Sequence, residues 1–392
     1  MVPRMEASPG RPGAGEIPAL YLGTVVAYAD MYLTQPILPL LSRQFDVGPA
    51  RAGLTVSAVV LTIAGASILY GPLSDLVGRR RVMAGALGLL ALATAACGLA
   101  PSFGALVSLR ALQGLFVPGM TAVSVAYAGD RFPSDRLRAV VGGLIGASVV
   151  GGLAGRVLAG WAAATLGWRP AFFGFGAATA LAAIGVARSL SPARAPAVGG
   201  LAAATRGLVG HLRDRRLAGA FLVGGALFFS WIGIFTYLPY HLSAPPWALS
   251  TGLVSSVYLV YGAGVVASPV AGRLSARVAP TTLVGVGLAV AALGLLGTLA
   301  HRLPVLVAAL VVLVLGTFTA QAVAPAFVNQ TARAAKGSAS ALYLTFYYLG
   351  GTLGSVLPGL AWQAAGWPGV VAACGAALAI ALAANALLCA PP

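Results

Sequence analysis

Apolar residues in this chain form long unbroken runs, and the polar residues gather in short stretches between them. A run of about 20 apolar residues is long enough for a helix to cross a hydrocarbon core about 30 Å thick. Strands of a membrane barrel would be shorter and would alternate in polarity. The pattern predicts an all-α integral membrane protein with twelve transmembrane helices, over residues 18–41, 52–74, 82–100, 105–128, 139–164, 170–189, 217–242, 250–272, 281–300, 305–328, 339–363 and 369–389.

The composition also points to the lipid bilayer as the main surroundings of the chain. Hydrophobic residues make up 59% of the 392 positions and charged residues only 8%, whereas about a quarter of a soluble domain is charged. The mean hydropathy is +0.92. Too little polar surface remains to cover a water-soluble globule.

The rarest polar residues argue against several kinds of site. The only lysine, Lys336, follows an alanine, so the chain has no Gly-Lys-Ser/Thr phosphate loop. Its three histidines lie far apart and lack the spacing that zinc needs. Three cysteines lie in or beside apolar runs and are expected to be buried thiols: Cys97, Cys374 and Cys389. We therefore expect a protein that is not an enzyme and that has no resident metal or cofactor.

The basic residues orient the helices. Of the 24 Lys and Arg residues, 18 fall on the side of the N-terminus, four fall on the opposite side, and two, Arg110 and Arg156, fall within spans. Positive charge in short loops marks the cytoplasmic side, so we expect a multi-pass protein of the inner membrane with both termini in the cytoplasm. Because the arginines lie between apolar runs, the net charge of +16 does not indicate a nucleic-acid partner.

The chain divides into two similar parts. The longest connection, residues 190–216, is expected to be a cytoplasmic linker between six-helix halves at 18–189 and 217–392, after an N-terminal tail at 1–17 that carries no signal-peptide core. The string GPLS at 71 is echoed by GRLS at 272, and GW at 167 by GW at 366, with offsets of 201 and 199. Parallel repeats of this kind build many secondary transporters, with the substrate site between the halves.

The loop after the second span carries a recognisable motif. Residues 71–83 read GPLSDLVGRRRVM and resemble the G-x-L-a-D-r-x-G-r-r/k-r/k motif of the major facilitator superfamily. Two glycines allow a tight turn and close helix approach, and the acid can pair with an arginine. We expect a gating cluster that holds two elements in one state: Gly71, Asp75, Gly78, Arg79 and Arg80, with Asp130 and Arg131. The alternative is a topology-setting basic loop with one incidental acid. The second half has Ala276 in place of the acid.

Two charged residues lie inside the first half of the bundle. Arg110, Gln113 and Gly114 match the pattern R-x-x-Q-G of the drug/proton antiporter-like branches. Asp30 is the only carboxylate deep in any span, and the two charges are expected at nearly the same depth. We expect Asp30 and Arg110 to couple transport to protons. The alternatives are a static pair that neutralises two charges, or an Arg110 side chain that reaches the interface.

The fifth span is rich in glycine but departs from the antiporter pattern. Its sequence GGLIGASVVGGLAGRVLAG resembles the antiporter motif in glycine content, yet it lacks the Gly-Pro pair and contains Arg156. Close helix packing explains the glycines equally well. Arg156 either has a function in the span or extends to the interface.

Polar and aromatic residues of six spans predict a small-molecule cavity. The lining candidates are Tyr28, Tyr32, Gln35, Gln113, Trp231, Tyr258, Tyr261, Gln321, Tyr343 and Tyr347, although any one of them can instead belong to packing or to an interfacial belt.

The resemblance implies a monomeric secondary transporter driven by the proton gradient, most similar to the drug or sugar-metabolite efflux branches. We favour export of a small molecule. Import by a proton symporter or an uncoupled facilitator, and a non-transporting membrane sensor, are the alternatives.

Overall fold

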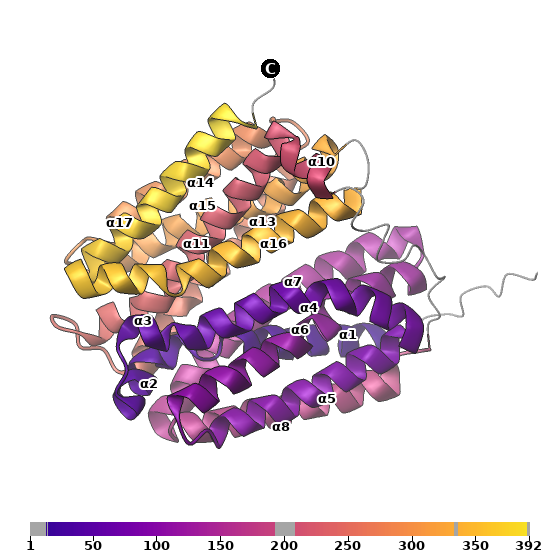
Figure 1. The fold of residues 1–392 in the computed structure, drawn as a ribbon, viewed down its shortest axis with the longest axis horizontal. Coiled ribbons are helices and arrows are strands. Elements are labelled where there is room, and N and C mark those ends of the chain that lie inside the picture. Colours follow the sequence, from indigo (N-terminus) through magenta and orange to yellow (C-terminus); the bar gives the residue numbers. More distant parts are fainter. Residues whose placement is uncertain (1–12, 14, 193–207, 333–335, 390–392) are drawn as a thin grey trace, which may run out of the picture.

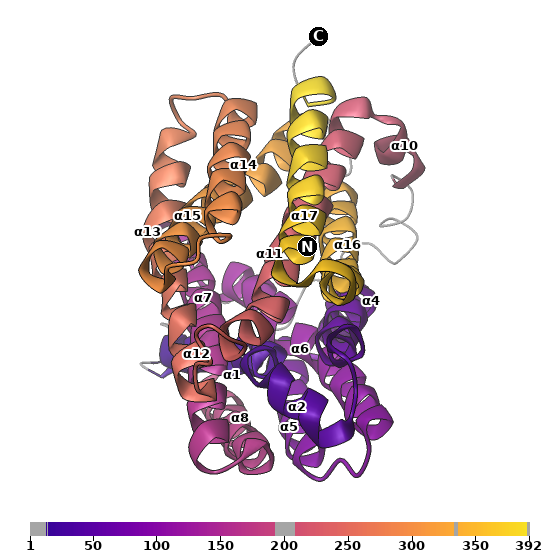
Figure 2. The same cartoon turned by 90° about the vertical axis from the view of Figure 1, so that its left-hand side faces the viewer.

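A computed structural model of the chain describes residues 13, 15–192, 208–332 and 336–389, and every regular element in these residues is a helix. Most of the predicted N-terminal tail and of the predicted linker lies outside the described residues. The helices of the first half occupy one side of the molecule and those of the second half the other (Figures 1 and 2).

The first half contains seven α-helices of more than one turn and two short helical segments. Its elements are α1 (Glu16–Tyr32), η1 (Gln35–Ile37), α2 (Leu38–Phe45), α3 (Pro49–Ala52), α4 (Leu54–Val77), α5 (Arg79–Gly98), α6 (Phe103–Arg131), α7 (Ser134–Thr165) and α8 (Trp168–Ser189). Helix α5 packs between α6 and α8, while α1 packs against α7 and α8.

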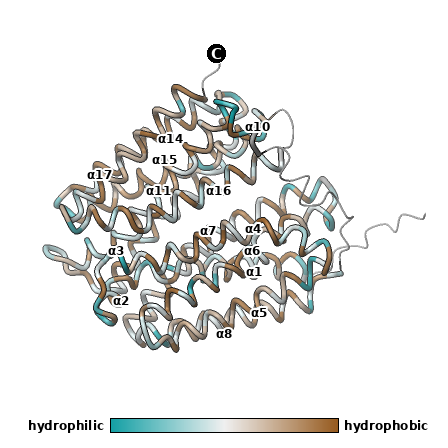
Figure 3. Tube along the Cα trace, viewed as in Figure 1, coloured by the Kyte–Doolittle hydropathy of each residue, from teal (hydrophilic) through white to brown (hydrophobic). Residues whose placement is uncertain are grey.

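The second half repeats this arrangement. Its elements are α10 (Leu208–Arg213), α11 (Arg215–Ser243), α12 (Thr251–Val257), η2 (Tyr258–Tyr261), α13 (Gly262–Leu274), α14 (Pro280–Gly297), α15 (Leu303–Thr331), α16 (Lys336–Gly354) and α17 (Leu357–Leu387). Helix α11 packs against α16 and α17, and α14 packs against α15. Figure 3 shows apolar residues along the helices of both halves and polar residues gathered at their ends.

The predicted fold class is confirmed, and ten of the predicted spans correspond to helical segments long and apolar enough to cross a membrane within the described residues. One of them, α17, is kinked at Ala365 and Gly366, where the backbone is not helical. The other two predicted spans are interrupted. Residues 18–41 form α1, η1 and α2 in succession, because the prolines at 36 and 39 cannot donate a backbone hydrogen bond. The predicted helix at 339–363 ends as α16 at Gly354, and α17 begins at Leu357.

Helix α1 also begins earlier than expected. It starts at Glu16 rather than at residue 18, and the Glu16 side chain is fully buried. The first half therefore includes a residue that the sequence reading assigned to an exposed tail.

The two ends of the bundle differ. We call the end where α8 finishes and α11 begins the linker end, and the opposite end, with the loops before α3 and after α11, the far end. Three side-chain hydrogen bonds join the halves toward the far end: Gln35 Nε2 donates to Thr236 Oγ1 at 3.1 Å, Ser42 and Tyr240 share a hydrogen bond of 2.6 Å, and Trp161 Nε1 donates to Ser256 Oγ at 3.0 Å. The halves are thus joined toward one end.

The repeat offset explains the first two of these bonds. Their partners are 201 and 198 residues apart, close to the offsets between the repeated strings. Equivalent positions of two halves can touch only near the axis that relates them. Residues Gln35 and Thr236 therefore mark this axis where the halves meet.

Candidate functional site

A cavity lies between the two halves and consists of two adjoining compartments. Both compartments are lined by Tyr28, Tyr32, Ser148, Phe228, Gln321 and Tyr347. The inner compartment, of about 90 Å³, is completed by Arg156, Trp231, Tyr261 and Phe318 among others. The outer compartment, of about 240 Å³, adds Pro325, Tyr343, Leu344 and Tyr348. Since α15 runs from the far end to the linker end, Phe318 places the inner compartment deeper toward the joined far end, and Pro325 places the outer one nearer the linker end.

Seven of the ten residues predicted for the cavity lie along its wall: Tyr28, Tyr32, Trp231, Tyr261, Gln321, Tyr343 and Tyr347. The other three do not line it. Gln113 lies inside the first half, Tyr258 is buried and donates to the backbone oxygen of Phe235 at 2.6 Å, and Gln35 bridges the halves. Five of the six spans expected to line the cavity contribute to its wall, at α1, α11, η2, α15 and α16. Helix α6 does not contribute, whereas α7, which was not expected to, does.

Arg156 is the one charged residue among those that line the cavity, and it is not among the ten residues predicted for it. Its side chain is only 1% exposed, so it does not extend to the interface. A signal was present: Arg156 follows Gly152 at a spacing of four on α7, and both line the inner compartment, as do Tyr28 and Tyr32 at the same spacing on α1.

The guanidinium of Arg156 is incompletely bonded. Nε donates to Gln35 Oε1 at 2.7 Å and Nη1 donates to the Gly152 backbone oxygen at 2.6 Å. The remaining nitrogen, Nη2, is buried and has no hydrogen-bond partner. Its Cζ lies 3.8 Å from the ring centroid of Tyr32 and 4.6 Å from that of Tyr261. Arg156 thus contacts aromatic rings of both halves while one donor stays unused.

By contrast, every nitrogen of the Arg110 guanidinium has an acceptor. Nη1 donates to the Asp30 backbone oxygen and to Gln113 Oε1, both at 2.7 Å, Nη2 donates to the Met31 backbone oxygen at 2.7 Å, and Nε donates to the Thr55 backbone oxygen at 3.0 Å. The side chain is fully buried, so it does not reach the interface. Arg110 therefore ties α1, α4 and α6 together inside the first half.

Asp30 lies at the same depth as Arg110, as expected, but Arg110 donates to the backbone oxygen of Asp30 and forms no ion pair with its carboxylate. Oδ2 of Asp30 accepts from Thr179 Oγ1 on α8 at 2.8 Å, while Oδ1 is buried without a partner. The residue is fully buried in the first half and does not line either compartment. The free oxygen leaves room for a proton on this carboxyl.

The predicted gating residues form two separate clusters at the linker end. Arg79 contacts both Asp75, at 3.2 Å, and Asp130, and its Nη1 donates to Ser74 Oγ at 2.9 Å. These groups join α4, α5 and α6 of one half. Arg131 does not enter this cluster, since it pairs with Glu16 instead.

The two motif glycines also differ. Gly78 has φ of +98° and allows the turn between α4 and α5, whereas a side chain at Gly71 would meet open space. The expected close helix approach at Gly71 is absent in this conformation.

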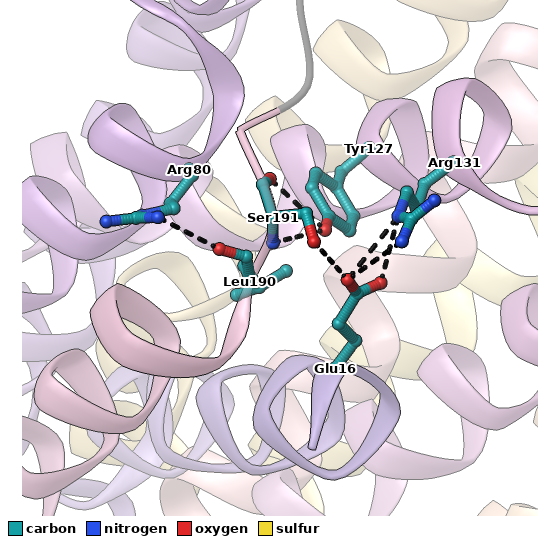
Figure 4. Close-up of polar contacts among 6 residues, drawn as sticks. All are labelled: Glu16, Arg80, Tyr127, Arg131, Leu190 and Ser191. Carbon is teal, nitrogen blue, oxygen red and sulfur yellow. Dashed lines mark hydrogen bonds and ion pairs between the residues drawn. The ribbon is translucent and has the colours of Figure 1, made fainter. Parts of the chain in front are cut away.

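The second cluster fixes the start of the linker to the first half (Figure 4). Glu16 accepts from Ser191 Oγ at 2.5 Å and from Arg131 Nε at 3.1 Å. The Ser191 backbone N–H donates to Tyr127 Oη at 3.1 Å, and Arg80 Nη1 donates to the Leu190 backbone oxygen at 3.2 Å. Sequence reasoning missed this role of Glu16, because the acid precedes the apolar run.

Glycines of α7 allow α1 to approach closely. A Cβ at Gly151 or Gly155 would overlap the backbone of Val25 or Ala29 on α1, while Gly142 and Gly146 face open space. This contact sets the position of Arg156 on α7 relative to Tyr32 on α1.

Comparison with known proteins gives consistent results. The family model described as Major Facilitator Superfamily matches residues 20–247 and 247–392. The chain is 32% identical over 368 residues to the Inner membrane transport protein YnfM of Escherichia coli (strain K12), covering 93% of this chain and 88% of the relative. It is 30% identical over 346 residues to the Uncharacterized MFS-type transporter YybF of Bacillus subtilis (strain 168), covering 88% and 86%.

A solved structure supports the fold. A bacterial homologue of the human lysosomal transporter Spinster, in an inward-facing and occupied conformation, matches with a TM-score of 0.78 over 94% of both chains at 17% identity. At this identity the likeness concerns the fold alone.

Proposed function

This chain belongs to the Major Facilitator Superfamily and is a multi-pass secondary transporter of small molecules, and from that premise we propose that it exports its substrate across the inner membrane in exchange for protons. The observation that carries the mechanism is the cavity between the halves, lined by residues of both and bounded toward one end by hydrogen bonds between them. Rocking of two repeats around a central site exposes that site to each side in turn.

The charge pattern supports the orientation of this cycle. With 18 of the basic residues on the side of the linker end, that end and both termini are cytoplasmic in our proposal. The far end, where Gln35 meets Thr236, then faces outward and is closed. The conformation described here is accordingly the inward-facing one, with the outer compartment nearer the cytoplasm.

We assign proton coupling to Asp30. It is the only acid deep in the spans, it is fully buried, and Oδ1 has no partner. A charged carboxylate in such surroundings is unfavourable, and the neighbouring Arg110 donates to the backbone oxygen of Asp30 rather than to its carboxylate. A proton therefore stabilises the carboxyl in this conformation. Tyr28 and Tyr32, two positions on either side along α1, line the cavity, so a shift of α1 during the cycle links the proton site to the substrate site.

The proposal is tested in proteoliposomes with an imposed pH gradient. Each member of a panel of sugars, amino acids, organic acids and lipophilic cations is added as radiolabelled probe. Antiport predicts accumulation of one probe class in vesicles with an acidic interior, and Asp30→Asn should abolish that accumulation while passive exchange continues. Thr34→Val removes a buried hydroxyl without a partner in the turn that follows α1 and serves as the matched control.

The alternatives predict different results. Accumulation in vesicles with an acidic exterior would indicate a proton symporter rather than an exporter. Exchange that ignores the gradient would indicate a facilitator, and probe binding without any flux would indicate a sensor. Asp30→Asn with accumulation at the wild-type level would move the proton site elsewhere.

A further inference from the structure

The inner compartment of the cavity contains an uncompensated positive charge. Of the eight Asp and Glu residues in the sequence, none lies between 215 and 389, so the helices of the second half offer no carboxylate to Arg156. Within the first half, the ion pairs among described residues are those of Arg79 and Arg131. None of the residues that line either compartment is acidic.

Arg156 also lacks a full set of neutral acceptors. A buried guanidinium is stable when its five N–H groups are bonded, and Nη2 has no acceptor. The rings of Tyr32 and Tyr261 attract the charge through their faces, but they do not accept in the plane of the guanidinium. A further donor is unused in the same compartment, because the Tyr261 hydroxyl is buried and has no partner.

We propose, on the basis of the transport function argued above, that the substrate is an organic anion whose acidic group binds Arg156 Nη2 and the Tyr261 hydroxyl in the inner compartment. Two donors without acceptors, one of them charged, fit a carboxylate or a similar oxyanion. A lipophilic cation is excluded from this compartment by repulsion from the same guanidinium. This distinguishes the site from one for cationic drugs.

The remainder of the substrate fits the outer compartment. That space is larger and is walled by aromatic side chains such as Phe228, Tyr343 and Tyr348. The rings of Phe228 and Tyr347 are stacked on each other with centroids 3.9 Å apart and form an aromatic stack in the wall. A planar apolar or aromatic body packs well against such a wall. Gln321 Nε2 donates to Tyr347 Oη at 2.6 Å and Ser148 Oγ donates to the Ile145 backbone oxygen at 2.7 Å, so the side-chain oxygens of these two residues can accept from hydroxyl or amino substituents.

Anion binding at this point also reaches the contact between the halves. Arg156 Nε donates to Gln35, and Gln35 in turn donates to Thr236 of the other half. Tyr261 belongs to the second half and Arg156 to the first. An oxyanion that bridges these two residues therefore stabilises the arrangement in which the halves meet at the far end.

The test measures binding, so that it does not depend on transport. Purified protein in detergent is titrated with benzoate, benzamide and benzylammonium, which share a ring and differ in charge, and with phenylphosphate and benzenesulfonate. Calorimetry and the shift in melting temperature report affinity. We expect at least one anion to bind ten times or more tightly than benzamide, and we expect no measurable binding of benzylammonium.

The variants locate the charge that is responsible. Arg156→Gln should weaken anion binding about ten- to a hundredfold and leave benzamide unchanged, and Tyr261→Phe should weaken it several-fold. Arg302→Gln, which removes an exposed charge at the far end, is the control for a general electrostatic effect and should bind as the wild type does.

Three outcomes would overturn the proposal: no anion binding at millimolar concentration, equal affinity for benzoate and benzamide, or equal losses in Arg156→Gln and Arg302→Gln. Anion binding that depends on Arg156 but is accompanied by no flux in proteoliposomes would leave the site intact and would refute the transport cycle instead.

Discussion

Two buried arginines of the first half, Arg110 on α6 and Arg156 on α7, occupy opposite kinds of surroundings. Every nitrogen of the Arg110 guanidinium donates to an acceptor of the first half, three of the acceptors being backbone oxygens. Arg156 has one nitrogen without an acceptor and contacts rings from both halves. Burial alone does not distinguish them, since neither is more than 1% exposed.

The difference follows from where the partners lie. If the halves move as rigid bodies, contacts within one half persist throughout the cycle and contacts between halves form and break. Arg110 is then a fixed part of the first half, while the surroundings of Arg156 change with the state. An arginine that is satisfied by its own half stabilises the fold, and an arginine left unsatisfied between halves is available to a ligand.

The largest effect on stability should come from replacing each of the two arginines in turn. Arg110→Ala removes four buried hydrogen bonds, to the backbone oxygens of Asp30, Met31 and Thr55 and to the Gln113 side chain, and should destabilise the protein by more than about 3 kcal/mol. Arg156→Ala removes an uncompensated charge, so its melting temperature in detergent should stay at or above that of the wild type. Equal losses in the two variants would mean that Arg156 also has a structural role.

The sequence predicted the fold class because runs of 20 apolar residues have one stable solution in lipid. It also predicted the depth of Asp30 and Arg110, since depth follows from the helical rise. It did not predict that Arg110 would bind the backbone at Asp30 rather than its carboxylate. Hydrogen-bond partners depend on helix rotation, and these helices are apolar on all sides, so no polar stripe indicates which face turns inward.

Helix rotation also explains why three of the predicted cavity residues do not line the cavity. Tyr258 and Tyr261 lie three positions apart in η2 and are both buried, yet only Tyr261 lines the cavity. Arg156 was ambiguous because an arginine a few residues from a helix end can either extend to the interface or turn inward. The close packing of α7 on α1 determines which of these two directions the Arg156 side chain takes. That contact joins residues more than 100 positions apart in the sequence, so the sequence does not reveal it.

A glycine pair on α7 offers a second test, of intermediate size. Gly155→Ala places a methyl group against the Ala29 backbone, which should push α1 away from α7 and cost about 1 to 3 kcal/mol. Gly146→Ala, on the open face of the same helix, should stabilise by up to about 1 kcal/mol, because alanine favours the helix. Melting temperatures of the two variants should therefore move in opposite directions.

The two glycine variants also test whether the surroundings of Arg156 depend on the position of α1. Displacing α1 moves Tyr32 and Gln35 away from Arg156, so Gly155→Ala should change anion affinity as well as stability. If Gly155→Ala is destabilised but binds anions as the wild type does, the site does not depend on the distance between α1 and α7.

A third test concerns Glu16, which pairs with Arg131 of the first half and accepts from Ser191 at the start of the linker. Glu16→Gln keeps the size of the side chain but removes the charge that pairs with Arg131, and should cost about 1 to 2 kcal/mol. Asp46→Asn is the matched control, because Asp46 is exposed and its φ of 50° is one that asparagine adopts readily. Unchanged thermal stability in Glu16→Gln would show that the buried pair contributes nothing net.

A fourth test concerns the orientation of the protein in the membrane. In intact cells, a cysteine at His301, exposed at the far end, should react with a membrane-impermeant maleimide, and one at Ala276, exposed at the linker end, should be protected. The three native cysteines are buried, so the unmodified protein gives a low background. Labelling at 276 from outside would reverse the orientation and turn the cavity toward the exterior.

The smallest effect should come from Asp75→Asn in the motif after α4. Asp75 is 27% exposed and pairs with Arg79 at 3.2 Å, and we expect this partly exposed pair to contribute about 1 kcal/mol. Arg79 keeps Asp130 and Ser74 as partners, so expression and anion binding should be retained. Because the cluster biases the equilibrium between two states only by its own energy, transport should slow by about two- to fivefold. Turnover at the wild-type rate would mean that Asp75 only belongs to a loop that sets topology. Loss of anion binding would show that the linker end is coupled to the charge on Arg156, even though every contact described for Asp75 lies in the first half.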